Sequence, residues 1–376
     1  MIDLLVIQPT PFCNINCSYC YLSDRSNPDR ITLSVLDSII QQVLNSNLCG
    51  DTITIVWHAG EPLVIPVDYF ALLLERANQA FHNKKISVTH SIQTNGVLIT
   101  QDWCDLIIKY NINIGISIDG PMNLHDVNRK TRSGKGTFNS VMAGIKLLRA
   151  NNIRYHGIAV ISKHSLLFAK ELFDFFYENN FYQLGLNIEE IEGHNVKSSM
   201  EDTSYEAIYS FYKELFDLYV NSGMKKMRIR EFDNYLQAIL RNPEILDINV
   251  LDIQSHQIRP FAITSVNYKG DVSTFSPELI GQNSSEYNNF IFGNFSTDTF
   301  DVLRKNRLLK KMTAEIKSGI KKCKKECEFY SICGGGAPAN KFYENETFNS
   351  TETLYCKYNI QIPASIVLKY LEEKIQ

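Results

Sequence analysis

The first 222 residues alternate between short, β-branched apolar runs and longer segments whose apolar residues recur at helical spacing. The short runs predict strands, and the longer segments predict helices. Six consecutive strand–helix units of this kind favour a parallel sheet with helices outside it, as either an open doubly wound sheet or a barrel. We expect the strands at 4–8, 52–58, 86–93, 112–118, 154–161 and 183–188, and the helices at 33–45, 69–81, 101–109, 138–150 and 166–179.

The pattern changes in the second half of the chain. Two helices are predicted at 205–222 and 231–241, and the apolar period then becomes two around 261–268. Lys269-Gly270-Asp271 follows as a turn signal, which indicates a β-hairpin. The expected domains are the α/β domain over 1–222, a helical bridge over 223–260, and a smaller domain over 261–376 that contains the hairpin and further helices at 300–317 and 363–375.

Charge and hydropathy exclude two classes of partner. The 38 Lys and Arg and the 41 Asp and Glu give a net charge of -3, so bulk electrostatic binding to nucleic acid is not expected. The longest apolar runs are far below the roughly 20 residues of a membrane span. No targeting segment opens the sequence, which predicts a cytoplasmic protein. In that compartment clustered cysteines are metal ligands or catalysts more often than disulfides.

Three of the nine cysteines, Cys13, Cys17 and Cys20, follow the first predicted strand on one short loop. Three thiolates can hold three irons of a cubic 4Fe-4S cluster, and no fourth cysteine lies nearby in the sequence. The alternative is a zinc knuckle, which needs four ligands and commonly uses Cys-x2-Cys pairs. An iron without a protein ligand is an open site, where a small chelating molecule can bind and receive an electron.

The spacing Cys-x3-Cys-x2-Cys, with Tyr19 before the last cysteine, resembles the signature of the radical S-adenosylmethionine (SAM) superfamily. In that superfamily the open iron binds SAM, and reductive cleavage gives a 5'-deoxyadenosyl radical that abstracts hydrogen. The resemblance implies a partial (βα)6 TIM-type barrel with a smaller C-terminal iron-sulfur domain made of a β-hairpin and helices. It also implies reduced flavodoxin or ferredoxin as the electron donor.

The segment Trp57-His58-Ala59-Gly60-Glu61-Pro62 resembles the superfamily's Gly-Gly-Glu-Pro motif, with Ala59 in place of the first glycine. Small residues let the backbone approach a ligand closely. Glu61 can accept a charge-assisted hydrogen bond from the methionine ammonium of SAM. The alternative is an ordinary turn that contains Gly and Pro.

Later strand ends carry further residues that the resemblance places around SAM. The alternatives are common Asn-Gly and Asp-Gly turns, surface arginines and plain core residues. One of the two arginines is expected to bind the methionine carboxylate, and the last two residues are expected to meet the adenine through their backbone. The residues are Thr94, Asn95, Ser117, Asp119, Arg129, Arg132, Val160 and Leu186.

The second cysteine group, Cys323, Cys327, Cys333 and Cys356, supplies four ligands, enough for one complete cluster or for a zinc ion. Cys333-Gly334-Gly335-Gly336 resembles the SPASM domain of peptide-modifying radical enzymes, which carries two auxiliary clusters. This sequence departs from that pattern, because Ala337 and the segment 271–275 lack two of the expected cysteines. The missing ligands belong to one cluster, so the resemblance implies a single auxiliary 4Fe-4S cluster ligated fully by protein.

The opening segment 6–22 resembles the maturases of glycine-rich-repeat peptides, which join an aromatic ring to a β-carbon and form cyclophanes. The resemblance implies a ribosomal precursor peptide as substrate, and the free edge of the hairpin over 261–274 is expected to pair with it. The alternatives are a radical enzyme acting on a small molecule or on another protein residue, and a non-enzymatic iron-sulfur or zinc protein. Several acidic residues are candidates for the catalytic base. For each of them the alternative is an ordinary solvated acidic side chain. These candidates are Glu189, Glu190, Glu192, Asp271 and Glu278.

Overall fold

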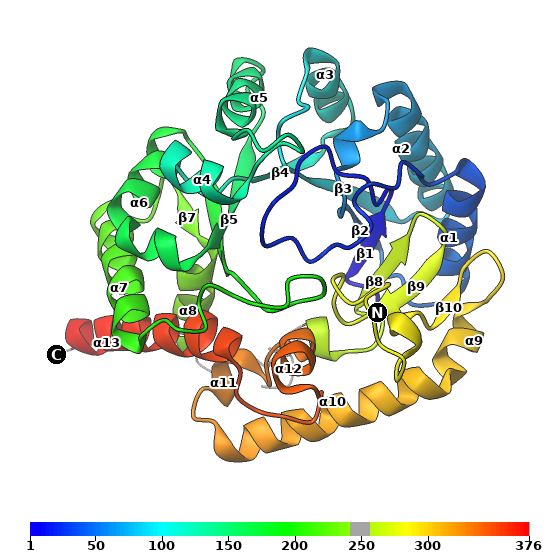
Figure 1. The fold of residues 1–376 in the computed structure, drawn as a ribbon. Helices are drawn as coiled ribbons and strands as arrows, with labels where there is room; N and C mark the ends of the chain where they lie inside the picture. The colour runs from blue at the N-terminus through cyan, green and yellow to red at the C-terminus, as the bar shows by residue number, and fades with distance from the viewer. Residues whose placement is uncertain (241–255, 376) are drawn as a thin grey trace.

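The computed structural model describes residues 1–240 and 256–375, and this part of the chain is built on one ten-stranded sheet (Figure 1). The strand order across the sheet is β10-β9-β8-β1-β2-β3-β4-β5-β6-β7. No described helix is long and apolar enough to cross a membrane. The strands are β1 (Leu4–Gln8), β2 (Thr52–Trp57), β3 (Ser87–Thr94), β4 (Asn113–Ser117), β5 (Tyr155–Ile161), β6 (Gln183–Ile188), β7 (Arg228–Ile229), β8 (Ile263–Asn267), β9 (Asp271–Thr274) and β10 (Gly293–Asn294).

The parallel part of the sheet, β1 to β7, confirms the predicted alternation of strands and helices. The strands curve around a central space, and the helices lie outside them (Figure 1). Helix α1 shows why the pattern works: Thr32 caps it by accepting a hydrogen bond from Val35 N, and its apolar face is buried. The helices are α1 (Leu33–Asn45), α2 (Val67–His82), α3 (Gln101–Tyr110), α4 (Met122–Asn128), α5 (Phe138–Ala150), α6 (Ala169–Glu178), α7 (Tyr205–Asn221) and α8 (Arg230–Leu240).

Two elements of this part were not predicted. The short helix α4 follows Pro121, and the two-residue strand β7 pairs in parallel with β6 and so extends the sheet by one strand. Residues 241–255 of the predicted helical bridge lie outside the described residues. The described part of the bridge includes β7 and α8, which continue the strand–helix alternation.

The C-terminal hairpin continues the same sheet. Strand β8 pairs in parallel with β1 from Leu4–Ile263 to Gln8–Asn267, and on its other side it pairs antiparallel with β9. Strand β9 in turn pairs with β10. The expectation of a free hairpin edge over 261–274 is therefore wrong, because both sides of β8 and of β9 already carry backbone hydrogen bonds.

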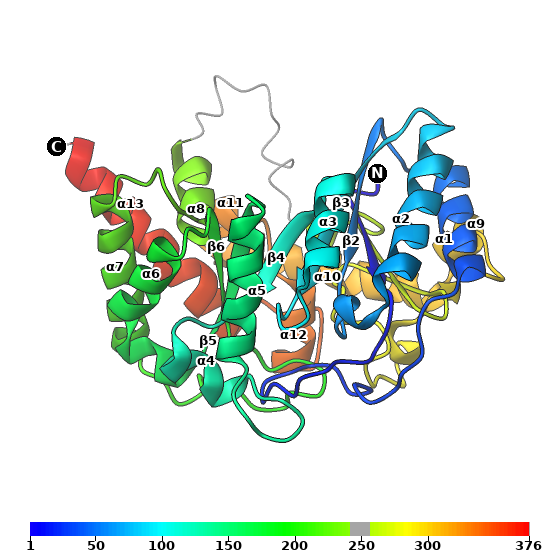
Figure 2. The ribbon, with the colours of Figure 1, turned by 90° about the horizontal axis from the view of Figure 1, so that it is seen from above.

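The remaining helices run from the β10 end of the sheet to its β7 end (Figure 1). The last helix packs against α7 and α8, which brings the end of the chain back to the barrel (Figure 2). A six-residue π-helix, Cys356–Gln361, leads into it. The helices are α9 (Phe300–Lys305), α10 (Arg307–Glu326), α11 (Tyr330–Cys333), α12 (Pro338–Asn345) and α13 (Ile362–Ile375).

The inner face of the sheet is polar in places. Along β5, buried residues alternate with partly exposed ones, as expected where one face meets the helices and the other meets the central space. At Gly115 on β4, an added Cβ would collide with the side chains of Gln93 and His156, so both side chains cross the inner surface of β4. Polar side chains therefore lie on the inner face of β4.

Candidate active site

The loop that carries Cys13, Cys17 and Cys20 leaves the carboxyl end of β1, the edge where ligands bind in parallel α/β folds. Other segments hold this loop in place. Asn16 N donates to Lys130 O at 2.6 Å, and Ser18 N donates to Asn128 O at 3.0 Å. The guanidinium of Arg132 donates to Cys13 O at 2.8 and 3.0 Å. Arg132 is thus engaged with the loop backbone.

The surroundings of the three thiols suit an anionic metal-bound group. Asn95 Nδ2 lies 3.8 Å from Cys13 Sγ, and Arg129 Nη1 lies 4.0 Å from Cys17 Sγ. Burial raises the pKa of Cys13 to about 12 and that of Cys17 to about 11, so free thiolates are disfavoured there. Metal coordination removes that penalty, because the metal binds the thiolate form. The donors and the burial together fit a cluster on this loop.

Glu61 lies beside the loop and is only 1% exposed. Its Oε1 accepts hydrogen bonds from Thr94 Oγ1 at 2.6 Å and Leu63 N at 2.9 Å, and its Oε2 accepts one from Asn95 N at 2.7 Å. Burial raises the pKa of Glu61 to about 7, although these hydrogen bonds lower it. The structure therefore brings Glu61, Thr94 and Asn95 together next to Cys13, as expected.

The backbone next to Glu61 is tightly fitted to the cysteine loop. Ala59 and Gly60 both have positive φ, 72° and 57°. A Cβ at Gly60 would meet the carbonyl oxygens of Thr10 and Phe12, the latter at 2.7 Å. Glycine is therefore required at position 60, where the backbone approaches the loop most closely.

Asp119 and Arg129 form a buried ion pair next to Tyr19. Arg129 Nε lies 3.1 Å from Asp119 Oδ1, Tyr19 Oη donates to Asp119 Oδ2 at 2.5 Å, and Val160 N donates to Asp119 Oδ1 at 2.9 Å. Burial lowers the pKa of Arg129, but the nearby Asp119 carboxylate outweighs it and the net pKa is raised. The Nε of Arg129 is buried, and its contact with Asp119 is an ion pair without hydrogen-bond alignment.

The other expected SAM contacts are placed as follows. Ser117 Oγ accepts a hydrogen bond from Gln93 Nε2 at 2.8 Å on the inner surface. Leu186 is fully buried, and its N–H donates to Glu231 Oε2 at 3.0 Å. The amides of Val160 and Leu186 are thus both paired with carboxylates of the chain.

The second cysteine group gathers from four segments. Cys323 lies on α10, Cys327 directly after it, Cys333 at the end of α11, and Cys356 at the start of the π-helix. Burial raises the pKa of Cys333, and that of Cys356 to about 12. The other three thiols of the group lie close enough to Cys356 to add to this rise.

The places where two further cysteines were missing are closely packed. Ala337 is 8% exposed, and in the segment 271–275 the residues from Val272 to Phe275 are all fully buried. Gly335 N donates to Cys333 Sγ at 3.4 Å, and Gly334, Gly335 and Gly336 all have positive φ. The glycine run is therefore bent around the Cys333 sulfur.

The candidate bases separate into two groups. The half-buried Glu190 and Glu278 lie in one cluster with the buried Glu192. Glu189 accepts a hydrogen bond from Ser199, and Asp271 accepts hydrogen bonds from Asn267 and Asn294. Burial raises the pKa of Glu190 to about 8, against a 2.6 Å hydrogen bond from Asn340 that lowers it. Burial also raises the pKa of Glu192, with Glu278 and Glu190 adding to the rise.

Three residues of this cluster were missed by sequence reasoning: His58, Tyr21 and Tyr343. Tyr21 Oη lies 3.3 Å from His58 Nε2. Burial lowers the pKa of His58, while the Glu278 carboxylate opposes that shift. The signal for His58 was its place directly before Ala59 at the end of β2, where site residues gather.

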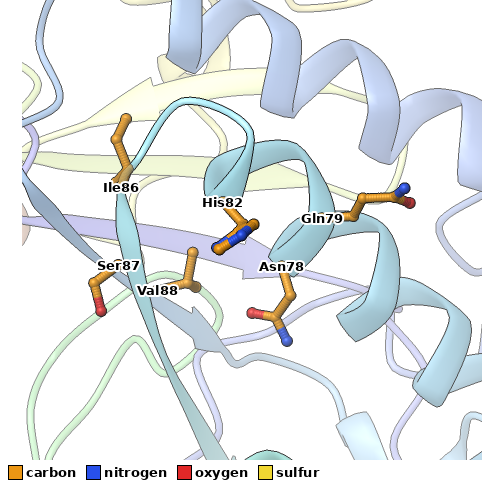
Figure 3. Close-up of a pocket in the computed structure, with 6 residues that line it drawn as sticks. All are labelled: Asn78, Gln79, His82, Ile86, Ser87 and Val88. Carbon is orange, nitrogen blue, oxygen red and sulfur yellow. The ribbon is translucent and has the colours of Figure 1, made fainter.

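Figure 3 shows a pocket far from these groups, at the end of α2 and the beginning of β3. That is the amino end of β3, opposite the edge that carries the cysteine loop. The pocket is not part of the site described above. Its lining residues are Asn78, Gln79, His82, Ile86, Ser87 and Val88.

Comparison with known proteins decides the family. Residues 7–176 match the family model described as Radical SAM superfamily. An uncharacterised protein of Synechocystis, sll1766, is 37% identical over 99% of this chain and 93% of its own length. The chain belongs to the radical SAM superfamily. The loop with Cys13, Cys17 and Cys20 lies within the residues that match the family model.

Two further relatives narrow the class of this radical SAM enzyme. A serine-type anaerobic sulfatase-maturating enzyme of Bacteroides thetaiotaomicron is 26% identical over 88% of this chain and 81% of its own. The solved structure of native anSMEcpe with bound AdoMet and Cp18Cys peptide superposes with a TM-score of 0.78 at 21% identity, over 100% of this chain and 98% of that one. The partial TIM-type barrel is confirmed, and the protein is a radical SAM enzyme related to maturases of peptides and proteins.

Proposed function

We propose that this enzyme forms a carbon–carbon bond between an aromatic ring and a β-carbon of a ribosomal precursor peptide in the cytoplasm, giving a cyclophane. The observation that carries the proposal is the presence of two separate cysteine groups in one fold, one on a three-cysteine loop and one with four cysteines, in which each cysteine is buried or partly buried. The resemblance of residues 6–22 to cyclophane-forming maturases supports the choice of bond, and the relationship to maturases supports a peptide substrate.

Each cluster is assigned to one of the two cysteine groups. Cys13, Cys17 and Cys20 would hold the SAM-binding 4Fe-4S cluster, and the group of Cys323, Cys327, Cys333 and Cys356 would hold the auxiliary one. SAM and the first cluster, when bound, would supply a 5'-deoxyadenosyl radical with an electron from reduced flavodoxin or ferredoxin, and the auxiliary cluster would supply an acceptor for one electron.

Residues of the chain orient SAM. Oε2 of Glu61 receives one hydrogen bond among the described residues, so it can accept a second from the methionine ammonium. Asp119 and Arg129 form an ion pair, and Tyr19 donates a hydrogen bond to the carboxylate of Asp119. Thr94 and Asn95 fix Glu61 through its hydrogen bonds, and Asn95 also reaches Cys13.

We assign the proton acceptor to Glu278. The crosslink removes two hydrogens from the peptide: one leaves as an atom to 5'-deoxyadenosyl, and the other leaves the ring as a proton and an electron. Glu278 is half-buried, accepts a hydrogen bond from Ser276 and lies close to His58, Glu190 and Glu192, where a carboxylate can take up the ring proton.

Mass spectrometry of a peptide co-expressed with the enzyme tests the proposal, with short repeat-bearing peptides encoded beside the gene as the substrates. The product should be lighter by two hydrogens per modification, and fragment ions between the joined residues should be missing. Deuterium at the β-carbon should appear in 5'-deoxyadenosine.

Oxidation of a single serine to an aldehyde gives the same loss of two hydrogens, and the sulfatase-maturating relatives make it the second candidate. An aldehyde reacts with a hydrazide probe and leaves the fragment ladder complete, whereas a crosslink does neither. A hydrazide adduct together with a complete fragment ladder would show that the enzyme oxidises a single residue, and would contradict the crosslink.

A further inference from the structure

A buried lysine lies against the second cysteine group. Lys341 belongs to α12, which follows the Gly334–336 run, and it is only 3% exposed. Its Nζ donates to Cys323 Sγ at 3.2 Å and to Gly335 O at 2.7 Å. The ammonium therefore touches one cysteine of the group and the backbone that carries another.

The position of this ammonium requires a negative partner. Burying an unpaired charge is costly, because the interior solvates it far less well than water does. Among the described residues no carboxylate forms an ion pair with Lys341; its contacts are a sulfur and a carbonyl oxygen. The contact that can carry negative charge is the Cys323 sulfur, because a metal binds the thiolate form of cysteine.

The four neighbouring lysines on α10 differ in this respect. Lys321, Lys322, Lys324 and Lys325 are all exposed, so solvent and salt screen their charges. Lys324 directly follows Cys323 in the sequence. Its side chain is thus a matched control for Lys341, with the same charge close by but in water.

We propose that Lys341 is a positioning residue that favours one-electron reduction of the cluster held by Cys323, Cys327, Cys333 and Cys356. Reduction adds one negative charge to the cluster, and a fixed cation that is hydrogen-bonded to a ligand sulfur stabilises the more negative state. In the proposed crosslinking reaction that electron comes from the ring-addition radical as the ring proton passes to the base. The inference rests on the auxiliary cluster and holds whichever bond the enzyme forms.

The test uses full-length protein in which Cys13, Cys17 and Cys20 are replaced by Ala, so that only the second cluster remains after anaerobic reconstitution. Iron content and the midpoint potential are measured, the latter by dithionite titration followed by electron paramagnetic resonance. In this background we compare Lys341→Gln, which keeps a hydrogen-bond donor without the charge, with Lys341→Met and Lys341→Arg. Lys324→Gln is the control.

We expect every variant to keep its iron. Lys341→Gln and Lys341→Met should lower the equilibrium constant for reduction by about tenfold or more, which for one electron is about 59 mV. Lys341→Arg should shift the potential less than either, and Lys324→Gln should leave it unchanged.

Two results would overturn the inference. An unchanged potential in Lys341→Met with full iron would show that the charge has no influence. Iron lost from both neutral variants but kept in Lys341→Arg would make Lys341 a structural tether between α10 and the glycine run. Absence of iron in the background protein with Lys341 intact would instead refute the auxiliary cluster itself, so the two failures are distinguishable.

Discussion

At the scale of single residues, Glu61 connects two parts of the site. It is fixed by donors from its own turn and from the end of β3, and it lies beside the loop that follows β1. Burial raises the pKa of Glu61 to about 7, because the protein interior stabilises the carboxylate form less well than water does. An ammonium group beside Glu61 stabilises that carboxylate form. This makes the residue a sensitive probe of SAM binding.

Glu61→Gln should keep both clusters and weaken SAM binding about tenfold to a hundredfold, since a hydrogen bond to a charged group contributes about 1.5 to 3 kcal/mol. Anaerobic calorimetry with SAM measures the change. Glu75→Gln, at an exposed carboxylate on α2, is the control and should bind normally. If the two variants bound SAM with the same affinity, Glu61 would have no part in SAM binding.

Glu190 gives a pH dependence whose sign follows from its raised pKa. The unfolded chain releases this proton at the ordinary glutamate pKa, whereas the folded protein holds it up to about 8. The stability that the proton contributes is complete at low pH and is lost as pH rises through 8. Glu190→Gln, which mimics the protonated form, should therefore stabilise the protein by about 1 to 3 kcal/mol at pH 9 and little at pH 4. Anaerobic denaturant titrations at both pH values check this, and an equal effect at both would contradict it.

At the scale of elements, the turn after β2 and the loop after β1 fit together through Gly60. We expect Gly60→Ala to displace the cysteine loop, because the added methyl group meets two loop carbonyls. Iron content should fall from about eight to about four per chain, the loss of one cubic cluster. Gly50→Ala is the control, since its added Cβ has only a side-chain sulfur nearby, at 3.7 Å. Full iron in Gly60→Ala would mean that the contact is not needed for cluster binding.

The strand–helix order could be read from sequence because side-chain periodicity is a local property, and helix α1 begins and ends as expected at Leu33–Asn45. Strand β7 was missed because two residues carry no periodicity. The pairing of β8 with β1 was missed because nothing local specifies a partner about 260 positions away in the chain. That pairing also removed the free hairpin edge.

The candidate site likewise contains residues that the sequence predicted and residues that only the structure shows. Cys13 and Glu61 were found because motif spacing and strand ends are visible in sequence. The roles of Arg132, which binds the loop backbone, and of Lys341 depend on contacts between distant segments. The same holds for the cluster around Glu278, whose members come from five parts of the chain.

At the scale of the whole molecule, the two cysteine groups make separable contributions. Replacing Cys13, Cys17 and Cys20 by Ala should leave about four irons of about eight. Replacing Cys327 or Cys333 by Ala should abolish crosslinking while slow formation of 5'-deoxyadenosine continues. Iron analysis, peptide mass spectrometry and nucleoside chromatography measure these outcomes, and stoichiometric zinc at the second group in active enzyme would contradict them.

The pairing of β1 with β8 also fixes an order of events on the ribosome. After β2 has been made, roughly 200 more residues are synthesised before β8 appears, which takes about 10 to 40 s. Throughout that interval one edge of β1 has no backbone partner. The loop that receives the first cluster continues from β1, so its support is completed late in translation. We expect stalled nascent chains that end before residue 256 to acquire iron at this loop poorly, and chains extended past the hairpin to acquire it well.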